Sequence, residues 1–306
     1  MLKLIKEISK KSRVAGTEQC NKVRDILIKK LESLGHQIEI QKLPFIGWEV
    51  IVKPKLKINN KNIEVLPVIW SGSTKGILKG ILKETSSIKT FEAYKWIRYK
   101  IVDGIKTKGY VITRPDIIWL QLIDQKSKLP YFMVHPKTYK KIKDKKNIKI
   151  EASIKSKFIK NQFIYNIITK NNSKKKIIVC AYYDSILNAP GANDNASGVG
   201  ALMEIAKTNK NIQYILFSAE EFNKYGSYSY VRLLKKEQLK KIKLLINIDM
   251  VGCGKPFCIC SKKIQNTIKK ILPKTTQIIT HPSPPFDYWP FYKKGVDVVF
   301  FWSVSL

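Results

Sequence analysis

The fold of this chain is decided by two neighbouring stretches of its sequence, Cys180-Ala-Tyr-Tyr-Asp-Ser185 and Pro190-Gly-Ala-Asn-Asp-Asn-Ala-Ser-Gly198. In the first stretch, Asp184 follows an apolar run that is typical of a buried strand. In the second, Asp194 lies in a polar, glycine-containing turn that opens a helical pattern. In α/β proteins, the C-terminal ends of buried parallel strands are where ligand and metal chemistry is placed. The two acids therefore predict a functional site at such a strand end.

Strands and helices alternate in the second half of the chain. Apolar, β-branched runs predict strands at 163–168, 176–182, 212–217, 244–248, 257–260, 277–279 and 296–301. Helical periodicity falls between them at 197–207, 227–236 and 263–272. Near-continuous apolar strands joined by helices predict an α/β domain, with a mostly parallel sheet flanked by helices on both faces.

The first half divides into two parts. Residues 1–45 carry a helical pattern at 17–34, with Thr17 as N-cap and Gly35 as stop, and an alternating strand at 36–43. Residues 46–160 predict a small β-rich insert with one helix at 91–102 and strands at 48–52, 63–69, 76–82, 109–112, 117–122 and 131–134. The expected organisation is 1–45 and 161–306 as the α/β domain, with 46–160 inserted.

The composition gives weak guidance on partners. The chain has 306 residues and a formal net charge of +34, but only five of its 57 basic residues are arginine. Because arginine is the residue that reads phosphates and guanine bidentately, specific nucleic-acid binding is disfavoured. No apolar run approaches the roughly 18 residues of a membrane span, and the N-terminus has no signal-peptide core. We expect a cytoplasmic protein.

The five cysteines predict no disulfide framework, because their number is odd and their spacing unpaired. Cys253, Cys258 and Cys260 are candidate thiolate ligands, but Cys258 and Cys260 fall two apart in a predicted strand, without a chelating turn. Buried, inert thiols are the favoured interpretation of all three.

Acidic residues follow several of the predicted strands. Four acidic sites fall at or just beyond the ends of predicted strands, at the same end of the predicted sheet. They are Asp184, Asp194, the pair Glu220-Glu221 and Asp249. Like charges that converge in a cleft repel each other unless a cation neutralises them. The sequence therefore predicts a metal site.

These residues resemble the di-zinc aminopeptidases of peptidase family M28, whose relatives include glutamate carboxypeptidase and glutaminyl cyclase. The resemblance covers about 140 residues of this chain and rests on the order and spacing of five motifs: Ala181-Tyr-Tyr-Asp-Ser185, Gly191-Ala-Asn-Asp-Asn-Ala-Ser-Gly198, Glu220-Glu-Phe-Asn-Lys-Tyr-Gly-Ser227, Asn247-Ile-Asp-Met-Val-Gly252 and Phe286-Asp-Tyr-Trp-Pro-Phe291. It implies a zinc-exopeptidase-like phosphorylase/hydrolase sandwich and an insert similar to the family's protease-associated domain.

The resemblance also implies roles for individual residues. Asp194 would bridge two metal ions, with Glu221 bound to one and Asp249 to the other. Glu220 would be the general base, and Asp184 would orient the family's first histidine.

Two departures concern that metal site. Tyr182 stands where the family has its first histidine, and the last histidine is absent because the chain stops at Leu306, so that the C-terminus looks truncated. Zinc favours imidazole or thiolate alongside carboxylate, whereas an all-oxygen site suits manganese, magnesium or calcium. Tyr182 is either a phenolate ligand, in place of the histidine, or a tyrosine packed on the sheet. His281 is either a substitute ligand or a surface residue.

Two functions remain open at this stage. One is a metallo-aminopeptidase that removes N-terminal residues from peptides through a metal-activated water, with zinc or another divalent metal as cofactor. The other is a catalytically inactive relative that acts as a binding or scaffold protein. The expected partner is a peptide, and the sequence does not indicate an oligomeric state.

Overall fold

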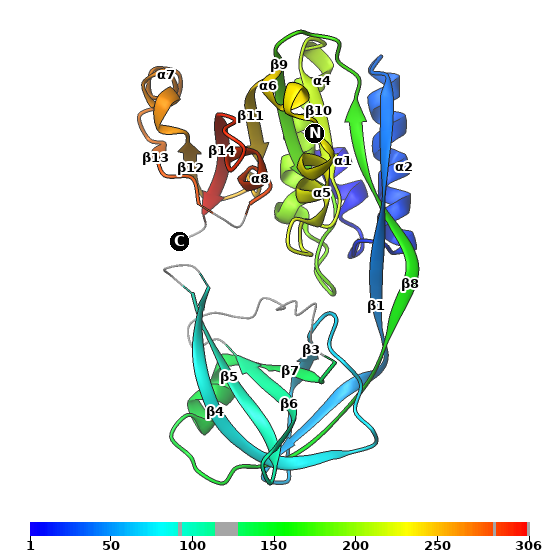
Figure 1. Cartoon of the computed structure of the whole chain (residues 1–306), viewed down its shortest axis with the longest axis vertical. Coiled ribbons are helices and arrows are strands. Elements are labelled where there is room, and N and C mark those ends of the chain that lie inside the picture. Colours follow the sequence, from blue (N-terminus) through cyan, green and yellow to red (C-terminus); the bar gives the residue numbers. More distant parts are fainter. Residues whose placement is uncertain (91–93, 114–127, 284–285, 305–306) are drawn as a thin grey trace. The chain divides into compact units, whose positions relative to one another are not determined.

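The structure is a computed structural model that describes residues 1–90, 94–113, 128–283 and 286–304. The chain divides into two compact units. Unit 1 comprises Met1–Phe45 and Asn161–Leu306, and unit 2 comprises Ile46–Lys160. Two long strands, β1 (Ile38–Ile58) and β8 (Lys149–Thr169), run from one unit into the other (Figure 1).

Unit 1 is built around a mixed sheet. Its strand order is β13-β12-β14-β11-β9-β10-β8, with parallel pairing except between β12 and β14 and between β10 and β8. The strands after β8 are β9 (Lys176–Tyr182), β10 (Gln213–Phe217), β11 (Ile242–Ile248), β12 (Lys255–Cys260), β13 (Gln277–Ile279) and β14 (Val298–Val304). Each of the seven strands predicted for this half of the chain overlaps one of these elements, and the α/β fold is confirmed.

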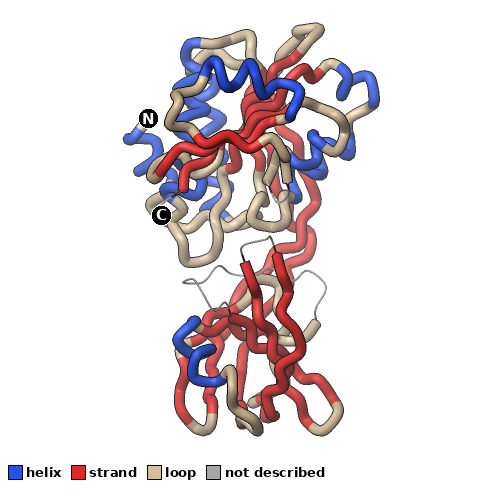
Figure 2. Tube along the Cα trace, turned by 90° about the vertical axis from the view of Figure 1, so that its left-hand side faces the viewer, coloured by secondary structure: helices blue, strands red, loops and turns tan. Residues whose placement is uncertain are grey.

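Helices accompany this sheet, as the blue segments around the red strands in Figure 2 show. They are α1 (Leu2–Ile8), α2 (Glu18–Ser33), α4 (Gly198–Thr208), α5 (Tyr225–Leu233), α6 (Lys236–Lys240), α7 (Gln265–Ile271) and α8 (Trp289–Tyr292), with a π-helical turn η1 (Ala192–Ser197) and a 3₁₀ turn η2 (Lys262–Ile264). The predicted helix at 17–34 is α2. Thr17 caps it by accepting the backbone N–H of Cys20 at 3.3 Å, and Gly35 follows it with a φ of 82°.

Strand β9 shows how the sheet separates two cores. Val179 and Ala181 pack into one core, together with residues of α1, α2 and α4. The alternate residues Cys180 and Tyr182 pack into the other, together with residues of α5 and α8. Because successive side chains of a strand point to opposite faces, this alternation places Tyr182 on the α5 and α8 side.

Unit 2 is almost entirely β-structure. Its strands pair in the order β8-β4-β5-β6-β7-β3, and β2 pairs with β1. They are β2 (Lys61–Ile63), β3 (Val65–Pro67), β4 (Leu78–Thr90), β5 (Tyr94–Asp103), β6 (Lys106–Thr113) and β7 (Tyr131–Val134). A small core contains Val68, Ile112, Tyr131 and Met133. Its assignment as a protease-associated-like domain stays a prediction.

The helix predicted at 91–102 is wrong, since residues 94–103 form strand β5 between β4 and β6. Ile97, Tyr99 and Ile101 are buried, whereas the cationic residues between them are less so. This period of two is that of a strand, and pairing on both sides supplies the backbone hydrogen bonds that a helix would have made internally. Residues 91–93, and the strand predicted at 117–122, lie outside the described residues.

One helix of unit 2 was not predicted. α3 (Pro136–Ile142) begins with a proline in its first turn, and the Nδ1 of His135 accepts the backbone N–H of Lys137 at 3.0 Å. A histidine in this capping role, in place of the usual serine or aspartate, concealed the start of the helix.

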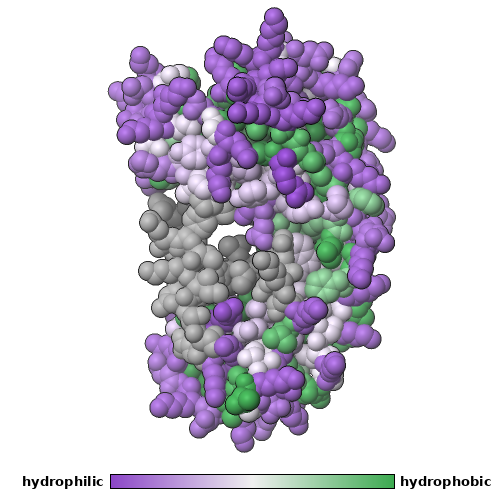
Figure 3. All heavy atoms as spheres, viewed as in Figure 1, coloured by the Kyte–Doolittle hydropathy of each residue, from purple (hydrophilic) through white to green (hydrophobic). Residues whose placement is uncertain are grey.

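The surface reflects the composition. Hydrophilic side chains, many of them lysines, cover most of the described surface on the face shown in Figure 3. Among the described helices, none is long and apolar enough to cross a membrane.

Candidate functional site

Six carboxyl groups gather at one edge of the unit 1 sheet, and we call them the acid cluster. β9, β10 and β11 are parallel neighbours, so their C-terminal ends meet at the same edge. The six residues are Asp184 after β9, Glu220 and Glu221 after β10, Asp249 after β11, Asp194 in η1 and Asp287 before α8. The structure thus brings together all the acids that the sequence singled out, and adds Asp287.

Burial raises the pKa of every carboxyl in the acid cluster. The pKa of Asp184 and that of Asp287 each rise to about 7, and those of Glu220, Glu221 and Asp249 rise well above their ordinary range. Neighbouring carboxylates add to the effect, as Asp194 does at both Glu221 and Asp249. A cluster that resists full ionisation in this way favours a cation or shared protons.

The carboxylate of Asp184 fixes the backbone that carries the glutamate pair. Its Oδ1 accepts the N–H of Glu220 at 3.1 Å, and its Oδ2 accepts the N–H of Glu221 at 3.4 Å. Asp184 is completely buried, so these bonds are shielded from water. Asp184 therefore orients the turn that presents Glu220 and Glu221.

Asn195 ties the turn that carries Asp194 to the end of β11. Its Nδ2 donates to the carbonyl of Ile248 at 2.9 Å, and its Oδ1 accepts the N–H of Gly198 at 3.0 Å and of Met250 at 3.1 Å. The peptide bond between Asp194 and Asn195 is cis. Since Ile248 and Met250 flank Asp249, the amide of Asn195 sets the two aspartates in place relative to each other.

Arg13 holds the loop that connects β9 with η1. Its fully buried guanidinium donates to the carbonyls of Tyr183 at 2.6 Å, of Gly191 at 2.9 Å and of Pro190. The backbone N–H of Arg13 also donates to the hydroxyl of Ser185 at 3.0 Å. The planar guanidinium thus donates to three backbone carbonyls at once. These hydrogen bonds fix the path of the chain up to Asp194.

Tyr182 is the last residue of β9, and its side chain ends at the acid cluster. The ring is buried, and the hydroxyl donates a hydrogen bond to Oδ1 of Asp194. Burial, and after it the charges of Asp194 and Asp249, raise the pKa of this phenol well above its ordinary value. The hydroxyl therefore keeps its proton.

The donor set fits a divalent cation on one side of Asp194. Glu221 is half-buried, and its carboxyl makes no hydrogen bond or ion pair with any described residue. Together with Asp194 it offers oxygen ligands, which suit magnesium or manganese. The resemblance implies a second cation position between Asp194 and Asp249. There, the protonated phenol of Tyr182 stands in place of the imidazole that zinc prefers, so this position does not fit zinc.

The carboxyls of the acid cluster are not arranged around a common point as the ligands of a metal ion would be. Over the ranges 1–90, 94–113, 128–283 and 286–304, no three histidine, cysteine, aspartate or glutamate side chains are grouped so as to hold a metal ion. Magnesium-type cations commonly keep several waters and bind through only one or two carboxylates. A pair of protein ligands, Asp194 and Glu221, is consistent with such binding.

Asp287 predicts a pH-dependent stability for the protein without metal. Both of its carboxyl oxygens are buried without a hydrogen-bond partner among the described residues. Its pKa is raised to about 7 when folded, against about 3.9 in an unfolded chain. The folded state therefore binds the proton more tightly, and the stability that this provides is complete below about pH 4 and lost as pH rises through about 7.

We expect Asp287→Asn to remove this pH dependence. The free energy of unfolding of the parent should fall by up to about 1.4 kcal/mol per pH unit between the two pKa values, and that of the variant should not. Urea unfolding at several pH values in chelator measures it. Asp25→Asn, on an exposed carboxyl of α2, is the control and should leave the slope as it is. An equal slope in Asp287→Asn and the parent would show that Asp287 does not titrate in this way.

The remaining candidate residues lie elsewhere. His281 is exposed, and Phe291, the last residue of the fifth motif, is fully buried in the core beside α5. Cys258 and Cys260 are buried, as favoured, and burial raises the pKa of Cys258 to about 12. The favoured burial of Cys253 is wrong, because it lies in the exposed turn that follows β11.

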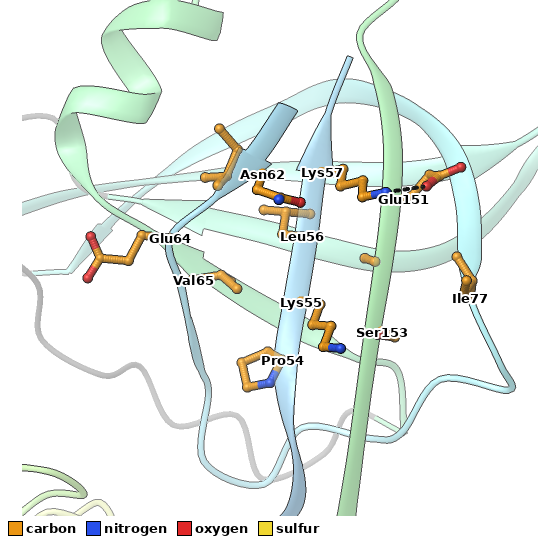
Figure 4. Close-up of a pocket in the computed structure, with 12 residues that line it drawn as sticks. Pro54, Lys55, Leu56, Lys57, Asn62, Glu64, Val65, Ile77, Glu151 and Ser153 are labelled. Atoms are coloured by element: carbon orange, nitrogen blue, oxygen red, sulfur yellow. Dashed lines mark ion pairs between the residues drawn. The ribbon is translucent and has the colours of Figure 1, made fainter. Parts of the chain in front are cut away.

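A cavity of about 600 Å³ lies within unit 2 (Figure 4). β1 and β8 border it, and Lys57 pairs with Glu151 across these strands at 3.8 Å. Lys55, Asn62 and Glu64 also line it. None of the acid cluster belongs to this cavity, so it contributes nothing to the site described above.

Sequence reasoning overlooked two residues that shape the site. Neither Arg13 nor Asn195 was assigned a role from the sequence. The available signal for Arg13 was its rarity: arginine is scarce in this lysine-rich chain, and here it precedes Val14 and Ala15, which are buried with it.

A mixed α/β sheet whose parallel strands end in a cluster of carboxyls is an arrangement at which α/β proteins place ligand and metal chemistry. Residues 164–304 match the model of peptidase family M28. This segment of the chain is therefore similar to the zinc aminopeptidases of that family, which is the resemblance that the five motifs indicated.

Curated relatives agree with this over a shorter segment. Aminopeptidase YwaD of Bacillus subtilis is 41% identical over 113 residues, which make up 33% of this chain and 25% of that protein. Leucine aminopeptidase 2 of Trichophyton rubrum is 37% identical over 101 residues, 30% of this chain and 20% of that protein. The matched segment thus spans a quarter or less of these relatives.

Solved structures share the fold. A zinc aminopeptidase from Bacillus subtilis superposes with a TM-score of 0.73 at 21% identity, covering 98% of this chain and 83% of that one. A peptidase M28 precursor from Shewanella amazonensis gives a TM-score of 0.77 at 17% identity, covering 97% and 83%. At these identities the likeness establishes the fold alone.

Proposed function

We propose that this chain is a metal-dependent aminopeptidase-type hydrolase, which cleaves the first peptide bond of peptides with a free N-terminus. The observation that carries the proposal is the acid cluster, in which Asp184 holds the backbone of Glu220 and Glu221 beside Asp194 and Asp249. The match of residues 164–304 to the model of peptidase family M28 supports the same class of reaction.

A divalent cation is assigned to Asp194 and Glu221, and Asp249 is the third carboxyl within the same cluster. When bound, such a cation polarises a carbonyl and makes a water molecule more acidic. Oxygen ligands favour manganese or magnesium at this position, and zinc remains the cation that the family uses.

Glu220 is the proposed general base. Its carboxyl makes no hydrogen bond or ion pair with a described residue, so it is available to accept a proton from water. Burial raises its pKa, the charge of Asp287 raises it further, and the cation of Lys224 opposes the rise. A carboxyl whose pKa is raised in this way is a stronger base than an ordinary carboxylate, as a general base requires.

Metal content and hydrolysis, measured together, test the proposal. The purified chain should retain manganese, magnesium or zinc above background in elemental analysis, and it should release N-terminal residues from free but not from acetylated peptides. Asp194→Ala should lose both metal and hydrolysis, because it removes a ligand. A parent chain without metal or turnover after reconstitution, or an Asp194→Ala variant that binds metal equally well, would refute it.

The second candidate function is that of a non-catalytic relative that binds peptides. The hydrogen bond from Tyr182 to Asp194 favours it, since a phenol there stands in the place of a metal-binding histidine. Calorimetry separates the two functions. A non-catalytic binder would take up free-N-terminus peptides in the presence of chelator and leave them uncleaved.

A further inference from the structure

The hydroxyl of Tyr182 lies between two carboxyls of the acid cluster. It donates to Oδ1 of Asp194, and it also contacts the carboxyl of Asp249. Asp194 sits in η1 and Asp249 follows β11, so the tyrosine links acids from two different elements. Glu221, whose carboxyl has no described partner, is the residue that the resemblance assigns to the other ion bridged by Asp194.

A buried proton donor between Asp194 and Asp249 can relieve the repulsion between these two carboxyls, as a cation would. Two carboxylates that approach each other repel, and the repulsion is relieved by either a positive ion or a shared proton. The phenol contributes such a proton, but it offers no imidazole lone pair and adds no charge. Oδ1 of Asp249 has no hydrogen-bond partner among the described residues, so this acceptor remains free.

We propose that the hydroxyl of Tyr182 fills one of two cation positions in this site, so that the chain holds a single divalent cation through Asp194 and Glu221. The filled position is the one between Asp194 and Asp249. That the remaining position binds a cation rests on the proposed function, whereas the exclusion of a cation by Tyr182 does not.

The inference predicts a gain of metal in one variant. The parent chain, titrated with Mn²⁺ and with Zn²⁺ by calorimetry, should saturate at one ion. Tyr182→His should take up one ion more, because its imidazole supplies a ligand and the free oxygen of Asp249 completes the position. The additional ion should disappear in the double variant Tyr182→His with Asp249→Asn.

A matched control introduces a histidine elsewhere. Tyr228 is an exposed tyrosine of α5, and Tyr228→His should leave the metal content at the parental value. Elemental analysis after gel filtration gives the ion count independently of any catalytic activity. Circular dichroism confirms that each variant is folded, and the parental titration tests the inference even where Tyr182→His does not fold.

Each outcome decides between the two proposals. Two ions in the parent chain, or no additional ion in folded Tyr182→His, would overturn the inference. A parent chain with no ion and a Tyr182→His variant with one ion, lost again with Asp249→Asn, would support the inference and refute the proposed hydrolase function.

Discussion

Glu220→Gln is expected to lower the rate of peptide hydrolysis by about 10²- to 10⁴-fold, the usual contribution of a general base. The amide retains the shape of the side chain but does not accept a proton from water. Its backbone N–H still donates to Asp184, so the turn and Glu221 should stay in place. Metal content should therefore match that of the parent, and kcat should carry the loss rather than KM.

The control for this variant is Glu237→Gln, on an exposed glutamate of α6, which should leave both kcat and metal content unchanged. Steady-state kinetics on a free-N-terminus peptide and elemental analysis of the same preparations measure the two quantities. Hydrolysis at the parental rate in Glu220→Gln would remove Glu220 from the reaction. Loss of metal in Glu220→Gln would instead indicate that Glu220 is a metal ligand.

Arg13→Leu is expected to destabilise the fold by about 3–5 kcal/mol, the usual effect of removing one partner from a buried charged network. Leucine removes the donors that now serve the carbonyls of Tyr183, Pro190 and Gly191, of which that of Tyr183 is buried. It also removes the positive charge that faces Asp184. Arg13→Lys keeps that charge but has a single nitrogen in place of the three that now donate, so it should lie between the parent and Arg13→Leu.

Urea unfolding at neutral pH measures these differences. Arg232→Leu is the matched control, because Arg232 lies in the exposed last turn of α5, and it should change the free energy of unfolding by less than about 0.5 kcal/mol. Equal stabilities for Arg13→Leu and Arg232→Leu would mean that the loop keeps its path without the guanidinium.

The two proposals describe one site in different ways. Retained acids, a base held by Asp184 and an unpartnered Glu221 favour a working hydrolase. A protonated tyrosine on Asp194 favours a site with fewer metal ions than the resemblance implied. A single-cation hydrolase accommodates both sets of observations, and the ion count of the parent chain distinguishes it from an inactive relative.

Much of the fold was predictable from the sequence because it depends on local patterns. Continuous apolar runs predicted the strands of unit 1, and Thr17 with Gly35 predicted the limits of α2. The pattern at 94–103 was misread, since alternating aromatic, aliphatic and cationic residues resemble a helix face until pairing partners are known. Pairing with β4 and β6 decided that segment, and it is not a local property.

The sequence by itself determined which acids follow the strands and which family the chain resembles, because motif order and spacing are linear properties. Only the tertiary structure decided what those acids contact. Arg13 meets the carbonyl of Tyr183 across 170 positions of sequence, and Asn195 joins η1 to the end of β11. The hydroxyl of Tyr182 reaches Asp194 because β9 places this side chain on the face of the sheet that α5 and α8 cover. The position of that face depends on the packing of distant strands and helices, which the spacing of residues in the sequence does not encode.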